Sequence, residues 1–152
     1  MAINKRIFCD TNFLLDLFDV QRKRHYDAVA MLWYCSDNAQ TVQLLASISS
    51  FKDAYYILSR LYQDKDLARS SVESVMGRVI QPVDILSSYG AEALGSDEPD
   101  FEDGLIRVCA EHENATVLIT SDKKAFKGCA IPALTADAFL EQEGFDFEVI
   151  DF

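Results

Sequence analysis

The sequence predicts an α/β fold in which helices cover both faces of a central parallel sheet of four to five strands, giving three layers. Two observations support this prediction. Short apolar segments alternate along the chain with longer segments whose apolar residues recur at helical spacing. The length of 152 residues and an apolar share of 49% suit one domain with a single core.

The first half of the chain predicts strands and helices in alternation. A short apolar run ends at Cys9, and the sequence Asp10, Thr11, Asn12 that follows it can begin a helix. Further along, Ser49 and Ser50 precede a segment with a clear apolar helical face. The expected elements are a strand at 7–9, a helix at 25–36, a strand at 41–47, and helices at 51–62 and from 66 to about 79.

The second half continues the same alternation. Pro82 ends the preceding helix and lies in a segment that suits a third strand or an edge strand, where proline is tolerated. The expected elements are a strand within 79–86, a short helix at 88–94, a helix at 101–112, strands at 117–120 and 133–134, and a helix capped by Thr135 that ends at Gln142. Residues 1–143 are expected to form a single domain, and residues 144–152 an acidic and aromatic C-terminal tail.

Composition favours the cytoplasm. The longest uninterrupted apolar stretch, residues 28–35, is far shorter than the roughly 18 residues that span a bilayer, so no membrane association is expected. The four cysteines show no CxxC spacing and are interpreted as reduced, structural residues. The net charge of −11 argues against a nucleic-acid partner. That acidity is concentrated: residues 1–96 carry 10 basic and 11 acidic side chains, whereas residues 97–152 carry 4 and 14.

Acidic residues follow two of the predicted strands. Asp10 ends the first strand and Asp122 lies just past the strand at 117–120. Ligands of parallel α/β sheets bind at the carboxyl ends of the strands, so these two carboxylates are expected to converge. Three more acids stand out: Asp53 in a helix, and Asp100 and Asp103 at the start of another.

Each of these acids also has a purely structural interpretation. Asp10 can cap a helix, Asp53 can be a solvated helix residue, and Asp122 can begin a turn. Asp100 and Asp103 resemble a variant capping box. Several carboxylates in one cleft would repel one another unless a cation neutralised them, and aspartate oxygens without cysteine or paired histidine favour Mg²⁺ or Mn²⁺. Such an ion supports hydrolysis of phosphodiesters by a metal-activated water.

At these residues the chain resembles the PIN-domain family, in the branch of VapC-like toxin ribonucleases. The resemblance lies in five segments that follow the family order: FCDTNFLLDLF at 8–18, ISSFKDAYYILSR at 48–60, PDFEDGLIRVCA at 99–110, VLITSDKKAFKG at 117–128 and IPALTADAFL at 131–140. It implies a three-layer α/β/α fold and a Mg²⁺- or Mn²⁺-dependent endoribonuclease, the toxin of a bacterial toxin-antitoxin pair.

The resemblance also implies roles for individual residues. Asp10, Asp103 and Asp122 match family acids that hold metal, and Asp100 matches an additional acid that is either a ligand or a neighbour of the ligands. Asp53 stands where many PIN domains carry Glu, and it joins Asp10, Asp103 and Asp122 as a catalytic acid. Thr11, Asn12 and Thr120 match the supporting polar residues. Lys123 and Lys124 are expected to meet the substrate phosphate.

Partners follow from the same resemblance. An RNA substrate is expected, with an antitoxin that inserts a basic segment into the acidic site, and a homodimer in which Tyr26, Trp33 or Tyr34 contributes an interface; core positions are an equal alternative for these three aromatic residues. An alternative function is a PIN-like module that binds RNA or protein without cleavage. A phosphorylated receiver or a phosphatase with Asp10 as nucleophile is disfavoured, because it expects an acid where Asn12 stands.

Overall fold

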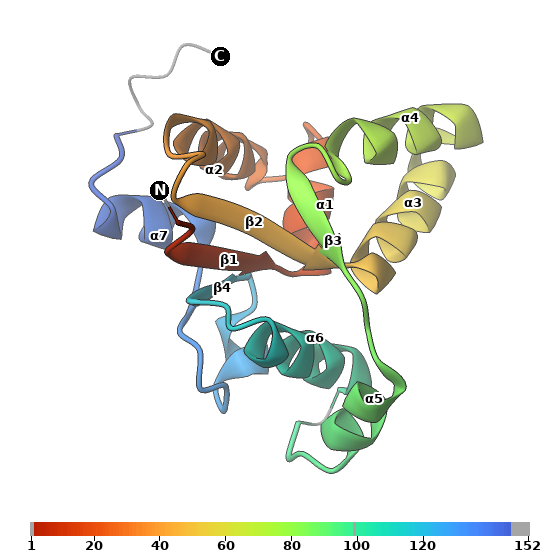
Figure 1. The fold of residues 1–152 in the computed structure, drawn as a ribbon. Helices are drawn as coiled ribbons and strands as arrows, with labels where there is room; N and C mark the ends of the chain where they lie inside the picture. The colour runs from red at the N-terminus through yellow and green to blue at the C-terminus, as the bar shows by residue number, and fades with distance from the viewer. Residues whose placement is uncertain (1, 99, 147–152) are drawn as a thin grey trace.

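The computed structural model describes residues 2–98 and 100–146. It has the three layers expected from the sequence, with a parallel sheet between two layers of helices (Figure 1). The strands are β1 (Lys5–Cys9), β2 (Val42–Ser47), β3 (Ile80–Val83), β4 (Val117–Ile119) and β5 (Ala133–Leu134). Within the described residues they form one five-stranded sheet in the order β3-β2-β1-β4-β5. The predicted fold class and strand number are confirmed.

The register places β1 at the centre of the sheet. Ile7 lies opposite Leu44 on one side and Val117 on the other, and Cys9 lies opposite Ile119. The chain moves outward from β1 to β2 and β3, and then crosses over to β4 on the opposite side of β1. The strand order therefore reverses between β1 and β4, and this is where parallel α/β sheets open a crevice at their carboxyl ends.

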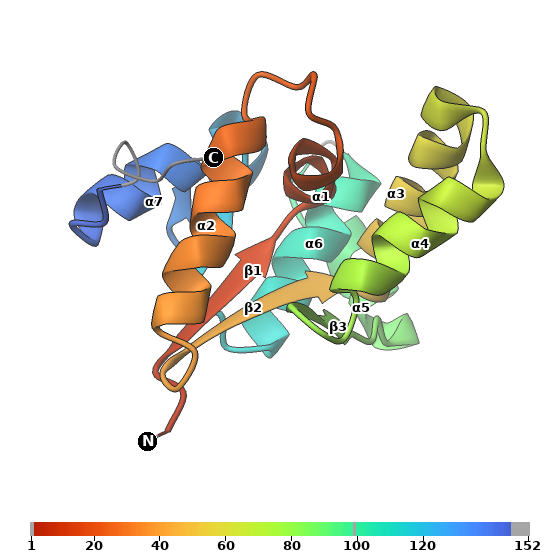
Figure 2. The same ribbon diagram turned by 90° about the horizontal axis from the view of Figure 1, so that it is seen from above.

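Seven α-helices and one 3₁₀ turn cover the sheet in the described residues. They are α1 (Thr11–Phe18), α2 (His25–Asp37), α3 (Ile48–Tyr62), α4 (Lys65–Val75), α5 (Ser87–Leu94), α6 (Phe101–His112), the 3₁₀ turn η1 (Lys123–Phe126) and α7 (Ala136–Gln142). Helices α1 to α4 and α7 lie over one face of the sheet, and α5, α6 and η1 lie over the other (Figures 1 and 2).

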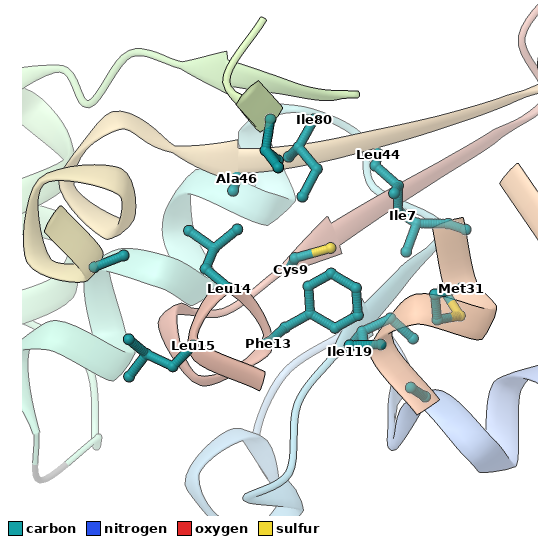
Figure 3. Packing of buried hydrophobic residues seen from close by; sticks show 14 of the residues in the cluster. Ile7, Cys9, Phe13, Leu14, Leu15, Met31, Leu44, Ala46, Ile80 and Ile119 are labelled. Atoms are coloured by element: carbon teal, nitrogen blue, oxygen red, sulfur yellow. The ribbon is translucent and has the colours of Figure 1, made fainter. Parts of the chain in front are cut away.

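Alternating residues of each strand build two hydrophobic cores. Ile7 and Cys9 of β1 join Phe13, Leu14 and Met31 beneath the larger helical layer, and their side chains pack together in Figure 3. Phe8 points to the opposite face, where it packs with residues of α5 and α6. Burial on both faces explains why residues 7–9 of β1, residues 44–46 of β2 and all of β4 are continuous apolar runs.

Two helix boundaries differ from the prediction. Helix α3 begins at Ile48, because Ser47 is extended and its hydroxyl accepts a hydrogen bond from the Ser50 amide at 3.1 Å. Helix α4 ends at Val75, because Gly77 adopts φ = +76° and turns the chain into β3. The 3₁₀ turn η1 was not predicted. The other predicted elements are confirmed to within a few residues.

The remaining expectations concern the cysteines, the aromatic residues of α2 and the tail. All four cysteines are free, with Cys9 and Cys109 buried. Tyr34 belongs to the core, where its ring meets Phe139 and Phe145 edge to face, whereas Trp33 is exposed. Phe145 belongs to the expected tail, but residues 147–152 lie outside the described residues, so the prediction for them stays a prediction. Within the described ranges, no helix is long and apolar enough to cross a membrane.

Candidate active site

Three of the predicted acids lie in the region of the carboxyl ends of β1 and β4, where the strand order reverses. Asp10 follows β1 directly, Asp122 follows β4, and Asp103 lies in the first turn of α6. The Thr11 hydroxyl at the start of α1 lies 3.5 Å from the Glu102 carboxylate at the start of α6, so the N-termini of these two helices lie close together. Asp103 adds to the electrostatic field at Asp10, and Asp122 adds to the field at Asp103, so the three carboxylates share one region.

Asp10 is the most firmly held of these acids. Its side chain accepts a hydrogen bond from the Phe13 amide at 2.9 Å, as the N-cap of α1, and another from the Thr120 hydroxyl at 2.6 Å. The residue is only 4% exposed. Burial raises the pKa of Asp10 to about 6, with smaller contributions from Asp16 and Asp103, although the two hydrogen bonds favour the ionised form. The fold therefore holds a carboxylate where its charge is poorly solvated.

Asp103 is half-buried at the start of α6. Asp100 caps this helix, and its carboxylate accepts a hydrogen bond from the Asp103 amide at 3.2 Å. Burial raises the pKa of Asp103 to about 6, and the charges of Asp100, Glu102 and Asp122 add to this effect. Proximity of several carboxylates is the environment that the sequence predicted.

The N-terminus of α6 is tied to the preceding loop. The Arg107 Nε donates to the Glu98 carboxylate at 2.7 Å, and both side chains are largely buried. At Gly104 a Cβ would come within 3.3 Å of the Ala93 Cβ, so the glycine allows α6 to pack closely on α5. These contacts fix the turn that carries Asp100 and Asp103.

Asp122 and the two lysines lie on the solvent side. Asp122 is exposed and caps η1, and its amide donates to the Thr120 hydroxyl at 3.0 Å. Thr120 is buried and forms hydrogen bonds with both Asp10 and Asp122, so it links the ends of β1 and β4. Lys123 and Lys124 are exposed in η1, directly beside Asp122.

Two of the expected site residues, Asp53 and Asn12, are more exposed than Asp10. Asp53 lies on α3 with 30% of its side chain exposed, and its carboxylate lies 3.1 Å from the Lys52 ammonium. Asn12 is exposed in the first turn of α1. Thr11, by contrast, is buried, and its hydroxyl lies 2.9 Å from the Ser50 hydroxyl.

Two further acids contribute to the site but were not singled out from the sequence. The Glu102 carboxylate lies 3.5 Å from the Thr11 hydroxyl, which donates to it. Asp16 is 6% exposed and accepts a hydrogen bond from the Arg22 Nε at 2.7 Å. The available signals were the acidic run around Asp103 and the position of Asp16 within the segment 8–18, but neither distinguishes a site residue from a solvated one.

The basic cluster at 22–25 is largely neutralised. Arg22 pairs with Asp16, and Arg24 pairs with Asp137 at 3.2 Å and with Asp27 at 3.9 Å. The His25 Nδ1 contacts the Asp16 carbonyl oxygen at 2.9 Å. Lys23 is exposed. The arginines of this cluster therefore serve the fold, and the lysines of η1 are the better placed cations.

The donor set fits a hard divalent cation. Carboxylate oxygens are the ligands that Mg²⁺ and Mn²⁺ prefer, and a cation beside Asp103 would offset the repulsion that raises its pKa. In residues 2–98 and 100–146, no three Asp, Glu, His or Cys side chains are gathered closely enough to hold a metal ion. Asp100 and Asp122 each accept a capping hydrogen bond at one carboxylate oxygen, Oδ1.

Comparison with known proteins defines the family. A family model described as PIN domain matches residues 6–124. The chain belongs to the PIN-domain family. A relative of this PIN domain is "Ribonuclease VapC1" of Aquifex aeolicus, which is 28% identical over 143 residues, or 91% of this chain and 96% of the relative.

Solved structures show the same fold at low sequence identity. The VapBC2 structure from Rickettsia felis, described as bound to a promoter DNA fragment, matches this PIN domain with a TM-score of 0.66 at 17% identity, covering 86% of this chain and 98% of that one. Mycobacterium tuberculosis VapC20, described as a sarcin-ricin loop cleaving toxin, matches with a TM-score of 0.63 at 16% identity, covering 80% and 94%.

Proposed function

We propose that this PIN domain is an endoribonuclease that uses Mg²⁺ or Mn²⁺, and that it is the toxin of a bacterial toxin-antitoxin pair. The observation that supports the proposal is that Asp10, Asp103 and Asp122 lie in the region where the strand order reverses, close enough for Asp103 to act electrostatically on Asp10 and for Asp122 to act on Asp103. The similarity to a relative named "Ribonuclease VapC1" along nearly the whole chain supports RNA as the substrate.

In this proposal the acidic residues have different roles. Asp10, Asp103 and Asp122 hold the cation, with assistance from Asp53 or Asp100. When bound, the cation supplies activation of water and neutralisation of the charge that develops on the phosphodiester. Thr120 orients Asp10 through its hydroxyl, and Thr11 and Asn12 support the same end of α1. Lys123 and Lys124 attract the RNA phosphate beside Asp122.

We infer the partners from the charge of the site. An acidic site of this kind suits a basic segment of an antitoxin, which would cover the carboxylates and exclude RNA. Structures of VapBC complexes from several bacteria share the fold of this chain, which supports an antitoxin as partner. A homodimer that uses the exposed Trp33 belongs to the same proposal.

The test is cleavage of a labelled structured RNA by the wild type and by Asp10→Asn, with Mn²⁺ and with EDTA. We expect cleavage only by the wild type with Mn²⁺, because both the cation and the Asp10 charge are required. Circular dichroism of both proteins controls for folding. Equal cleavage by the variant, or cleavage in EDTA, would refute the proposed mechanism.

A second candidate function is a PIN-like module that binds RNA or protein without cleavage. The lack of a gathered three-ligand cluster in the described part of the chain favours it, as does the acidity of the last third. The two functions differ in their response to Mn²⁺. An excess of 100-fold over the dissociation constant stabilises a metal-binding fold by about 2.7 kcal/mol. A binding module without a cation site would show no such rise in melting temperature.

A further inference from the structure

The acid on α3 pairs with the adjacent lysine. The Asp53 carboxylate lies 3.1 Å from the Lys52 ammonium, and the Asp53 side chain is 30% exposed. Within the described residues, Lys52 is the cation that contacts Asp53.

A small cavity lies beside Asp53. It measures about 20 Å³ and is lined by Ser47, Ser50, Asp53 and Glu102, together with apolar side chains of α6 and of the loop after β3. This is space for about one water molecule. Asp53 on α3 and Glu102 on α6 thus border the same space, and a longer side chain at position 53 would extend into it.

Glu102 reaches the site from the opposite wall of this cavity. Its carboxylate lies 3.5 Å from the Thr11 hydroxyl, which in turn lies 2.9 Å from the Ser50 hydroxyl. Thr11 directly follows Asp10, and Glu102 directly precedes Asp103. The Thr11 to Glu102 contact therefore joins the two elements that carry these acids. Glu102 is also exposed, so a hydrated cation can approach it.

We propose that Glu102 on α6, rather than Asp53 on α3, is the fourth acidic residue that faces the divalent cation in this protein. The assignment rests on the proposed function and deepens it. Glu102 borders the same cavity as Asp53, and its contact with Thr11 places its carboxylate beside the residue that follows Asp10.

The test measures Mn²⁺ affinity by isothermal titration calorimetry and by the Mn²⁺-induced rise in melting temperature. Glu102→Gln keeps the size and the acceptor for Thr11 but removes the charge, and we expect it to weaken Mn²⁺ binding about tenfold or more. Asp53→Asn should weaken binding by no more than about threefold, because it breaks only an exposed ion pair. Glu73→Gln, an exposed change on α4, is the matched control and should leave affinity unchanged.

A rescue experiment completes the test. Asp53→Glu, added to Glu102→Gln, should restore most of the Mn²⁺ affinity, because the added methylene extends the α3 carboxylate into the cavity. Unchanged affinity in Glu102→Gln, or an equal or larger loss in Asp53→Asn, overturns the assignment while the wild type still binds Mn²⁺ and cleaves RNA. A wild type that does neither overturns the proposed function and this assignment together.

Discussion

The two sides of the candidate site differ in how firmly the fold holds their carboxylates. On the β1 side, Asp10 is buried and accepts hydrogen bonds from the Phe13 amide and the Thr120 hydroxyl. On the α6 and η1 side, Asp103 is half-buried and Asp122 is exposed, and Asp122 accepts a 3.4 Å bond from the Ala125 amide of its own turn.

This difference divides the candidate site into a rigid half, which carries Asp10, and an adjustable half, which carries Asp103 and Asp122. The rigid half positions one charge in advance, and burial makes that charge unfavourable in the absence of a cation. The adjustable half can rotate toward a cation because few bonds restrain it. We therefore expect substitutions on the rigid side to change both activity and stability, and substitutions on the adjustable side to change activity alone.

The largest expected effect is on activity, and Asp103→Asn tests the adjustable half. RNA cleavage with Mn²⁺ should fall at least about 100-fold, because the variant removes a charge that faces the cation. The free energy of unfolding without metal should change by no more than about 0.5 kcal/mol, as is usual outside the core. A time course of RNA cleavage and a urea titration measure the two quantities. A strongly destabilised Asp103→Asn would remove the proposed distinction between the halves.

The pH dependence of stability tests the rigid half. The pKa of Asp10 is about 6 in the folded protein and is expected near 3.8 in the unfolded chain, so the folded state binds the proton more tightly. Well below pH 3.8 the carboxyl is protonated in both states, and Asp10 does not change the free energy of unfolding. As the pH rises from about 3.8 to about 6, the unfolded chain ionises before the folded one, so the protein should lose about 3 kcal/mol of stability from this group, and the loss is complete above pH 6.

Urea unfolding of the wild type and of Asp10→Asn at pH 4 and pH 7.5, in EDTA, measures that loss. The stability of the variant relative to the wild type should increase by about 2.4 kcal/mol between the two pH values, since Asn cannot ionise and part of the effect is already present at pH 4. A constant difference between the two proteins would show that Asp10 is solvated normally.

A smaller effect is expected at Thr120, which links the two halves. Thr120→Val removes the hydroxyl that donates to Asp10 and accepts from the Asp122 amide, so the free energy of unfolding should fall by about 1–3 kcal/mol. The pKa of Asp10 should also rise, moving the acidic limb of the activity profile to higher pH. Thr120→Ser keeps the hydroxyl and serves as the control. Thermal unfolding measures the loss of stability, and a pH-rate profile measures the shift of the acidic limb.

The smallest effect is expected at the lysines of η1. Lys123→Ala and Lys124→Ala should each weaken RNA binding a few-fold and reduce the slope of log affinity against log salt by about 0.7, as expected when one phosphate contact is lost. Lys127→Ala lies just past η1 and should do less. Fluorescence anisotropy at several salt concentrations, in EDTA to prevent cleavage, is the measurement. Equal slopes for all three variants would argue against a specific role for Lys123 and Lys124.

Local sequence patterns predicted most of the secondary structure because the signals are short-range. The apolar run before Asp10 and the serines before α3 act within a few residues of the chain. The end of α4 was misplaced because helical spacing continues to Val79, while Gly77 turns the chain so that Ile80 can pair with Leu44. That pairing is a contact between distant segments, and no local pattern contains it.

The sequence likewise predicted some features of the candidate site and not others. Position after a strand identified Asp10 and Asp122, because the carboxyl ends of parallel strands share one edge. The sequence did not distinguish Glu102 from its acidic neighbours, because the distinction depends on the packing of α6 beside α1. It also did not show that Asp53 pairs with Lys52, because this depends on the side-chain conformation chosen in the folded protein.

The sequence by itself determined the fold class, the order of the elements and the acidic character of the site, because apolar periodicity and residue type can be read directly from the order of the amino acids. Only the tertiary structure decided which carboxylates are buried, which are adjustable and which face one another. Burial and electrostatic repulsion arise when segments far apart in sequence are packed together, so the raised pKa values of Asp10 and Asp103 are properties of the fold.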